Sequence, residues 1–280
     1  PVGIRASEAE RLNEYLKDSP VKAAMMYNQR TNRLYKKARE LVKSGAIGEI
    51  TRVNFIITNW YRAQCYYDQG GWRAKLSGEG GGTLINQCVH QLDLLQWITG
   101  APKSVRAEMA TVNRKIFTEN EVTAVFTYPN GAKCSFTCSA HELHGTNRLE
   151  IAGTKGRLIV EGLWLKYQIF KESEAEVNCT AVKGYGRTGR KKYKVFYGPK
   201  IITDTLFGQQ LNVIRRFCRA LDGRGEFVAE ANEGITALRM INAVYLSHWT
   251  NKEVPLDFDS AEYDRILDEK INNEINLLRG

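Results

Sequence analysis

The sequence predicts an α+β fold built on a large, mostly antiparallel open sheet with helices on one face. Two observations carry this prediction. Residues 132–140 alternate apolar and polar side chains with the period of two that is typical of a strand with one covered face. Similar strand patterns follow one another at short intervals through the middle of the chain, whereas helical spacing dominates before and after them.

The composition of the 280 residues is that of a globular protein, with 43% hydrophobic and 25% charged residues. This length corresponds to one large domain or about two ordinary ones. No stretch approaches the ~18 consecutive apolar residues of a membrane span, so we expect no membrane partner. The six cysteines include no CxxC pair, which is typical of reduced thiols in a cytoplasmic protein.

The first part of the chain predicts two helices and two strands. Ser7 and Glu10 have the spacing of a capping box, with which a first helix would begin. The β-branched and apolar runs and the helical spacing that follow predict a strand, a helix and a strand over 21–27, 34–45 and 49–60.

The middle and the end of the chain predict a meander followed by helices. Asn130-Gly131 is a strong hairpin signal between two of the strands. A sheet of this kind has one covered face and one face that is exposed to solvent or used for assembly. Strands are predicted over 103–112, 122–128, 132–140, 148–153, 157–161, 163–170 and 191–197, and helices over 211–221, 237–244 and 259–279.

A glycine run comes directly before a helix that we predict over 82–99. Gly80, Gly81 and Gly82 allow a ligand or another backbone to approach closely, and a helix N-terminus attracts anions. No Gly-Lys-Ser/Thr follows, so the run is not a P-loop. A tight turn fitted against the sheet is the alternative.

Four residues of this predicted helix share one face, namely Asn86, His90, Asp93 and Trp97. Polar groups on an otherwise apolar helix are costly unless they are paired or line a cleft. In a cleft, His90 could exchange a proton near neutral pH while Asn86 hydrogen-bonds the same ligand. The alternative is a buried histidine bonded to Asp93 or to a backbone carbonyl.

Residues 61–82 form a long loop rich in aromatic and arginine side chains, which suit a flat ring, a sugar or a phosphate. A plug over the sheet is the alternative. The side chains are Trp60, Tyr61, Arg62, Tyr66, Tyr67, Trp72 and Arg73, among which we assign Arg62 and Tyr67, with Asp93, to substrate binding.

Two weaker patterns have an ordinary structural interpretation that is favoured over a functional one. Cys138, His141 and His144 have spacings that zinc could use, but no fourth ligand is nearby, so we predict no metal site. The basic run over 183–200 could bind nucleic acid, but a solvated loop and a lysine-protected edge strand are favoured. We therefore expect no nucleic-acid partner.

The run from Gly80 to Trp97 resembles the signature of the glucose–fructose oxidoreductase/inositol dehydrogenase (Gfo/Idh/MocA) family. Further segments with family counterparts are Tyr27–Arg30, Ala46–Ile50, Trp72–Arg73, Ile151–Gly156 and 232–250. The resemblance implies three parts: the last αβ unit of a Rossmann domain over 1–28, a substrate-binding and oligomerisation domain over 29–258, and a helical tail over 259–280.

The resemblance also implies a function. The chain is similar to NAD(P)-dependent oxidoreductases that act on a sugar, a polyol or a related hydroxy compound, with NAD or NADP as cofactor. It implies that His90 and Asn86 are catalytic, with His90 as proton acceptor or donor, since Asn86 cannot titrate. It places Asn28, Trp72 and Arg73 near the cofactor, and implies a homodimer or homotetramer assembled through the open sheet.

One departure from the family bears on activity. The dinucleotide fingerprint and the catalytic lysine of the family would both precede Pro1, and neither is in this sequence. A Rossmann site depends on the backbone amides of that glycine-rich turn. We therefore expect the 280 residues alone to bind NAD(H) or NADP(H) weakly or not at all, and to be inactive. A non-catalytic binding or dimerisation module of the same fold is the alternative.

Overall fold

The computed structural model describes residues 1–185, 189–197, 202–203 and 208–279. Within these residues, nine strands form one sheet in the order β8-β7-β6-β5-β1-β4-β3-β2-β9. Strands β1 and β4 pair in parallel and the other neighbours are antiparallel, which confirms the predicted mostly antiparallel sheet. The strands are β1 (Ile50–Ile57), β2 (Ser104–Ala110), β3 (Glu121–Thr127), β4 (Lys133–Ser139), β5 (Asn147–Gly153), β6 (Gly156–Glu161), β7 (Trp164–Phe170), β8 (Arg190–Val195) and β9 (Val254–Pro255).

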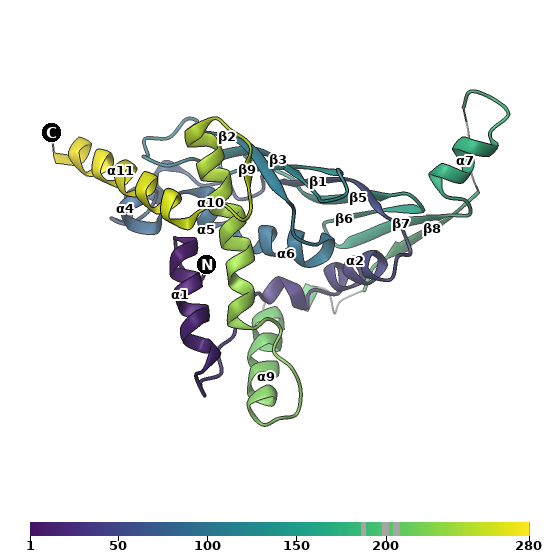
Figure 1. The fold of residues 1–280 in the computed structure, drawn as a ribbon, viewed down its shortest axis with the longest axis horizontal. Coiled ribbons are helices and arrows are strands. Elements are labelled where there is room, and N and C mark those ends of the chain that lie inside the picture. Colours follow the sequence, from purple (N-terminus) through teal and green to yellow (C-terminus); the bar gives the residue numbers. More distant parts are fainter. Residues whose placement is uncertain (186–188, 198–201, 204–207, 280) are drawn as a thin grey trace.

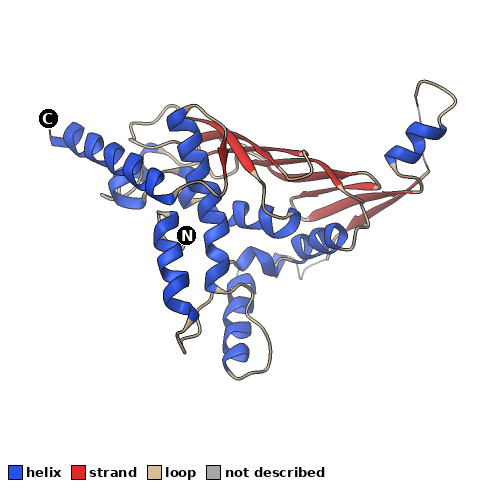
Figure 2. Cartoon of the chain, viewed as in Figure 1, coloured by secondary structure: helices blue, strands red, loops and turns tan. Residues whose placement is uncertain are grey.

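Helices α2, α6 and α10 lie against one face of the sheet, as Figures 1 and 2 show. The long helices are α1 (Ala6–Lys17), α2 (Arg33–Lys43), α6 (Val89–Thr99), α9 (Gln209–Leu221), α10 (Gly234–Thr250) and α11 (Ser260–Arg279). The short helices are η1 (Asn28–Thr31), α3 (Gln64–Asp68), α4 (Leu76–Glu79), α5 (Thr83–Asn86), α7 (Glu174–Thr180) and η3 (Ala231–Glu233). Helix α7 lies at the far tip of the sheet (Figure 1).

The core lies between the covered face of the sheet and these helices. Phe55 of β1, Phe126 of β3 and Phe136 of β4 have no exposed surface. The ring of Phe136 meets the rings of Phe55 and Phe126 edge-on, with centroids 6.2 and 6.1 Å apart. The alternation predicted for 132–140 is therefore confirmed, and it places every second residue of β4 in the core.

The predicted capping box at the first helix is wrong. Helix α1 begins at Ala6, and Glu8 closes its first turn by accepting hydrogen bonds from the backbone amides of Ile4 and Arg5 at 2.9 and 3.2 Å. The hydroxyl of Ser7 instead donates to Asp264 of α11 at 2.6 Å. Ser7, which the sequence spacing predicts as the N-cap, is therefore hydrogen-bonded to a residue distant in the sequence.

The predicted strand over 21–27 is also wrong. Among the described residues, this segment makes a single antiparallel bridge, between Ala24 and Glu230. A strand is stabilised by hydrogen bonds to its neighbours rather than by its own pattern. The segment has the composition of a strand and lacks the neighbouring strands with which to form one.

The predicted helix over 82–99 is divided in two. Helix α5 ends at Asn86 and α6 begins at Val89, because the carbonyl of Thr83 accepts from the amides of both Gln87 and Cys88, at 3.0 and 3.1 Å. Asn86 and His90 thus lie on either side of a junction between two helices.

The predicted terminal helix is confirmed as α11, which packs on α1 and α4. Its Glu274 is buried and accepts from the backbone amides of Leu76 and Ser77, at 2.6 and 3.2 Å. The terminal helix therefore holds the start of α4, which leads into the glycine run. In the described part of the chain, no helix is long and apolar enough to cross a membrane.

Candidate active site

The glycine run is held by a buried acid that the sequence analysis missed. The carboxylate of Glu119 accepts from the amides of Gly82 and Leu84 and from the hydroxyl of Tyr245, the last at 2.8 Å. A Cβ on Gly81 would stand 1.9 Å from that hydroxyl, so no larger residue fits. Burial raises the pKa of Glu119 to about 7. The run is a tight turn fitted against its neighbours, which was the alternative.

His90 lies in the first turn of α6 and is only partly exposed. Its Nδ1 is buried without a hydrogen-bond partner, and its ring meets Tyr27 edge-on with centroids 6.2 Å apart. Burial lowers the pKa of His90 below its ordinary value of 6.5. The imidazole is therefore neutral at neutral pH and has a nitrogen free to accept a proton.

Asp93 has a different partner from the one expected for a substrate-binding residue. Its oxygens accept from Nη2 and Nε of Arg30, at 2.6 and 2.8 Å, and both side chains are 1% exposed. Arg30 also pairs with Glu233 at 2.5 Å. Since buried charges are stable only when paired, Asp93 serves the fold. This arrangement supports neither of the two expectations for Asp93, a contact with substrate or a hydrogen bond to His90.

Asn86, at the end of α5, has a carboxylate beside it. Its Nδ2 donates to Glu79 of α4, whose other oxygen accepts from the amide of Ala74 at 2.7 Å. Its Oδ1 accepts from Nε2 of Gln87 at 2.9 Å. Burial raises the pKa of Glu79. Glu79 has no predicted role, although it is the acid between Gly78 and the glycine run.

The aromatic loop brings Arg62 and Arg73 together around Tyr66. Their guanidinium carbons lie 4.9 and 4.4 Å from the centroid of the Tyr66 ring. The hydroxyl of Tyr66 accepts from Arg73 at 2.5 Å and from Gln87 at 3.3 Å. Since Gln87 also bonds Asn86, this part of the predicted substrate site is continuous with the α5–α6 junction.

The other predicted ligand-binding residues lie around this junction. Tyr67 is buried next to Thr83 of α5. Trp72 is 50% exposed and stacks under Arg73, with the guanidinium carbon 4.4 Å from its ring centroid. Asn28 follows Tyr27, which contacts His90, and its amide donates to Gln209 of α9 at 3.3 Å.

The two weaker patterns take part in other contacts. The buried thiol of Cys138 neighbours that of Cys88, and Nε2 of His141 lies 2.6 Å from the carboxylate of Glu121. No group of three or more His, Cys, Asp or Glu in the described ranges could hold a metal ion. In the basic run, Lys191 to Lys194 are exposed on β8, whereas Arg187 and Lys200 lie outside the described residues.

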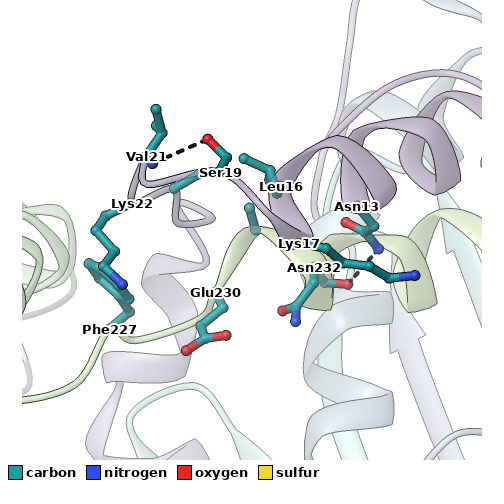
Figure 3. Close-up of a pocket in the computed structure, with 11 residues that line it drawn as sticks. Asn13, Leu16, Lys17, Ser19, Val21, Lys22, Phe227, Glu230 and Asn232 are labelled. Carbon is teal, nitrogen blue, oxygen red and sulfur yellow. Dashed lines mark hydrogen bonds between the residues drawn. The ribbon is translucent and has the colours of Figure 1, made fainter.

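A cavity of about 270 Å³ lies apart from His90, between the end of α1 and the segment before η3 (Figure 3). Asn13 and Asn232 face each other across it, with Nδ2 of the first 3.4 Å from the carbonyl of the second. It opens beside Val21, at the segment where the predicted strand does not form. We assign it no role in the site.

Part of the chain is similar to a known family. Residues 35–159 match the family model of the GFO/IDH/MocA C-terminal domain. The resemblance to the Gfo/Idh/MocA oxidoreductases predicted from the sequence is thereby confirmed.

Individual proteins agree with this class. Oxidoreductase P35 of Formosa agariphila is 24% identical over 159 residues, which are 56% of this chain and 49% of that protein. The chain thus spans about half the length of this curated relative.

Two solved structures share the fold. One is the WlbA dehydrogenase from Bordetella pertussis in complex with NADH and UDP-GlcNAcA, with a TM-score of 0.70 and 24% identity, covering 91% of this chain and 70% of that one. The other is levoglucosan dehydrogenase in complex with NADH and levoglucosan, with a TM-score of 0.72 and 18% identity, covering 91% and 72%.

Proposed function

We propose that this chain forms the substrate-binding part of an NAD(P)-dependent dehydrogenase that oxidises a hydroxyl group of a sugar, a polyol or a related hydroxy compound. The observation that carries the proposal is the neutral, partly exposed His90, whose Nδ1 has no partner and which lies at the junction next to Asn86. The similarity to dehydrogenases solved with NADH and sugar ligands supports it.

The two junction residues have complementary tasks in this proposal. His90 accepts the proton of the substrate hydroxyl, for which a neutral imidazole is required. Asn86 donates the second hydrogen of Nδ2 to the oxygen of the same hydroxyl, since the first is bonded to Glu79 and Oδ1 accepts from Gln87. Glu79 thereby fixes which end of the Asn86 amide faces the substrate.

The residues present fit only the nicotinamide end of a dinucleotide, which accepts the hydride when bound. Asn28, Trp72 and Arg73 surround that end in the proposal. The amides of Gly82 and Leu84 could have bound a pyrophosphate, but they are bonded to Glu119. These amides are therefore not free to hold a pyrophosphate, and we keep the expectation that the chain alone binds the cofactor weakly or not at all.

We also propose assembly into a homodimer or homotetramer through the open face of the sheet. Four large apolar side chains on that face are at least 36% exposed: Ile56, Val125, Trp164 and Phe196. Exposed apolar side chains gathered on one face are typical of an interface. Lysines such as Lys194, whose ammonium lies 3.7 Å from the Trp164 ring centroid, border them.

The test replaces His90 in the dehydrogenase that carries this chain. We expect His90→Gln to lower kcat at least about 100-fold on a panel of sugars and polyols, the lower bound for loss of a general base, measured as NADH formation. His248→Gln is the control, because the pKa of His248 is also lowered by burial, but its side chain is exposed and accepts from the backbone amide of Met109 on β2. An unchanged rate in the His90 variant removes this residue from the mechanism.

A further inference from the structure

Among the described residues, three arginines around Tyr66 and Tyr67 form no ion pair with a carboxylate. Arg62, Arg73 and Arg114 are all partly buried, and in the part of the chain that the structure describes, their guanidinium groups donate to backbone carbonyls or a tyrosine hydroxyl. The acids near them are otherwise engaged. Glu79 is bonded to Asn86, and the charge of Arg73 lowers its pKa, against the larger effect of burial, without an ion pair between the two groups in the described ranges. Asp68 of α3 accepts from Gln64.

The contrast with Arg30 shows what is missing. The guanidinium of Arg30 is paired with two carboxylates, those of Asp93 and Glu233. By comparison, Nε of Arg62 and Nη2 of Arg114 are buried without any partner. A buried donor on a charged group that makes no hydrogen bond destabilises the protein, so such donors indicate a ligand that satisfies them.

The backbone and the aromatic rings hold these arginines in place. Nε of Arg114 donates to the carbonyl of Arg62 at 2.8 Å, and its guanidinium carbon lies 5.4 Å from the ring centroid of Tyr61. Arg62 and Arg73 lie against Tyr66. Because the stems are already ordered, binding an anion would cost little side-chain entropy.

The cluster is continuous with the reacting end of the site. Tyr66 lies between Arg62 and Arg73, and its hydroxyl accepts from Gln87, which donates in turn to Asn86. Both Arg62 and Arg114 act on Tyr67, whose pKa they lower against the larger effect of burial. Hydrogen bonds through Tyr66 and Gln87 thus connect Arg73 to Asn86.

We propose that Arg62, Arg73 and Arg114 bind an oxyanion of the substrate, so that the compound oxidised at Asn86 and His90 is an anionic sugar rather than a neutral one. Guanidinium groups match carboxylate and phosphoryl oxygens with two parallel hydrogen bonds. The shared chemistry covers a uronate and a sugar phosphate. The inference rests on the proposed function, which it narrows to one substrate class.

The binding test uses the 280-residue chain, which contains all three arginines. Glucuronate, glucose 6-phosphate and glucose are titrated into it by calorimetry at low salt. We expect one of the two anionic sugars to bind at least about tenfold more tightly than glucose, which one charged hydrogen-bonded pair can supply. The better of the two identifies a carboxylate or a phosphoryl group as the ligand. Equal binding of all three, or no binding of the anionic sugars, overturns the proposal.

Variants separate recognition from folding. Arg114→Gln and Arg62→Lys should each remove most of the preference for the anionic sugar, and Arg219→Ala on exposed α9 should keep it. Circular dichroism shows whether each variant is folded. If Arg114→Gln does not fold, the milder Arg62→Lys replacement tests the proposal alone. A folded variant that retains the full preference contradicts the proposal, since the arginines would then serve packing alone.

The same set distinguishes this inference from the proposed function. His90→Gln should keep the preference for the anionic sugar over glucose, because both sugars present a hydroxyl to His90 and only the anionic one presents an oxyanion to the arginines. Anion binding without hydride transfer by the dehydrogenase would overturn the proposed function alone. Equal rates with glucose and with both anionic sugars would overturn the proposal of an anionic substrate and leave the proposed dehydrogenase function intact.

Discussion

Two segments with the pattern of a strand, residues 132–140 and 21–27, have different outcomes. The first forms β4, which is bonded along both edges, to β1 and β3. The second makes one bridge, at Ala24. The difference shows that an apolar, strand-like pattern becomes a strand only where neighbouring strands supply hydrogen bonds and a face to cover.

The side chains of the two segments differ in the same way. Phe136 of β4 has no exposed surface, whereas Val21 and Met26 are 63% and 47% exposed. Burial of apolar surface is the main favourable contribution to folding. The sheet and its helices should therefore determine the stability of this chain, while exposed residues of the second segment, such as Val21 and Met26, should contribute little to it.

The largest expected effect tests the first of the two segments, residues 132–140, which forms β4. Phe136→Ala removes a ring that packs against two others in the core, and we expect it to lower the free energy of unfolding by about 3–5 kcal/mol. Urea denaturation followed by circular dichroism measures the change. A loss below about 1 kcal/mol would show that this part of the sheet is not the stabilising core.

The second effect concerns the buried carboxyl group of Glu119, which holds the glycine run. Burial raises the pKa of Glu119 from its ordinary value of 4.5 to about 7. Between these values the folded protein binds more protons than the unfolded chain, so the free energy of unfolding should fall as the pH rises, by about 3 kcal/mol in total. Above pH 7 this contribution should no longer change.

Two variants isolate that contribution. Glu119→Gln cannot ionise, so its urea midpoint should lack the fall between pH 4.5 and pH 7 that the unaltered chain shows. Glu14→Gln, on the exposed face of α1 where Glu14 pairs with Lys17, should follow the unaltered chain. Identical pH profiles for Glu119→Gln and the unaltered chain would mean that Glu119 is not a buried titrating acid.

The sequence predicts the elements whose cause is local and misses those whose cause is distant. The meander was predictable because period-two alternation and the Asn130-Gly131 turn lie within each hairpin, and Gly131 has the positive φ of 85° that this turn requires. The division between α5 and α6 was not, because the amides before it are anchored by Glu119, which is 35 residues from Leu84.

The candidate site divides along the same line. His90 and Asn86 were readable from the helix pattern, and the structure places both at one junction. The pairing of Asp93 with Arg30 spans 63 residues and follows only from the fold. The contact of Glu79 with Asn86 spans 7 residues, so an acid inside a glycine run was a signal that sequence analysis could have used.

The smallest expected effect tests the other side of the comparison with a matched pair of variants. Val21→Thr keeps the shape of an exposed side chain, and we expect it to change the free energy of unfolding by less than about 0.5 kcal/mol. Val122→Thr buries the same hydroxyl in β3, where the valine has no exposed surface, and should cost about 1–3 kcal/mol. The two urea midpoints give the contrast directly. Equal losses would mean that residues 19–27 are as firmly part of the fold as the sheet, and that the single bridge at Ala24 understates their contribution.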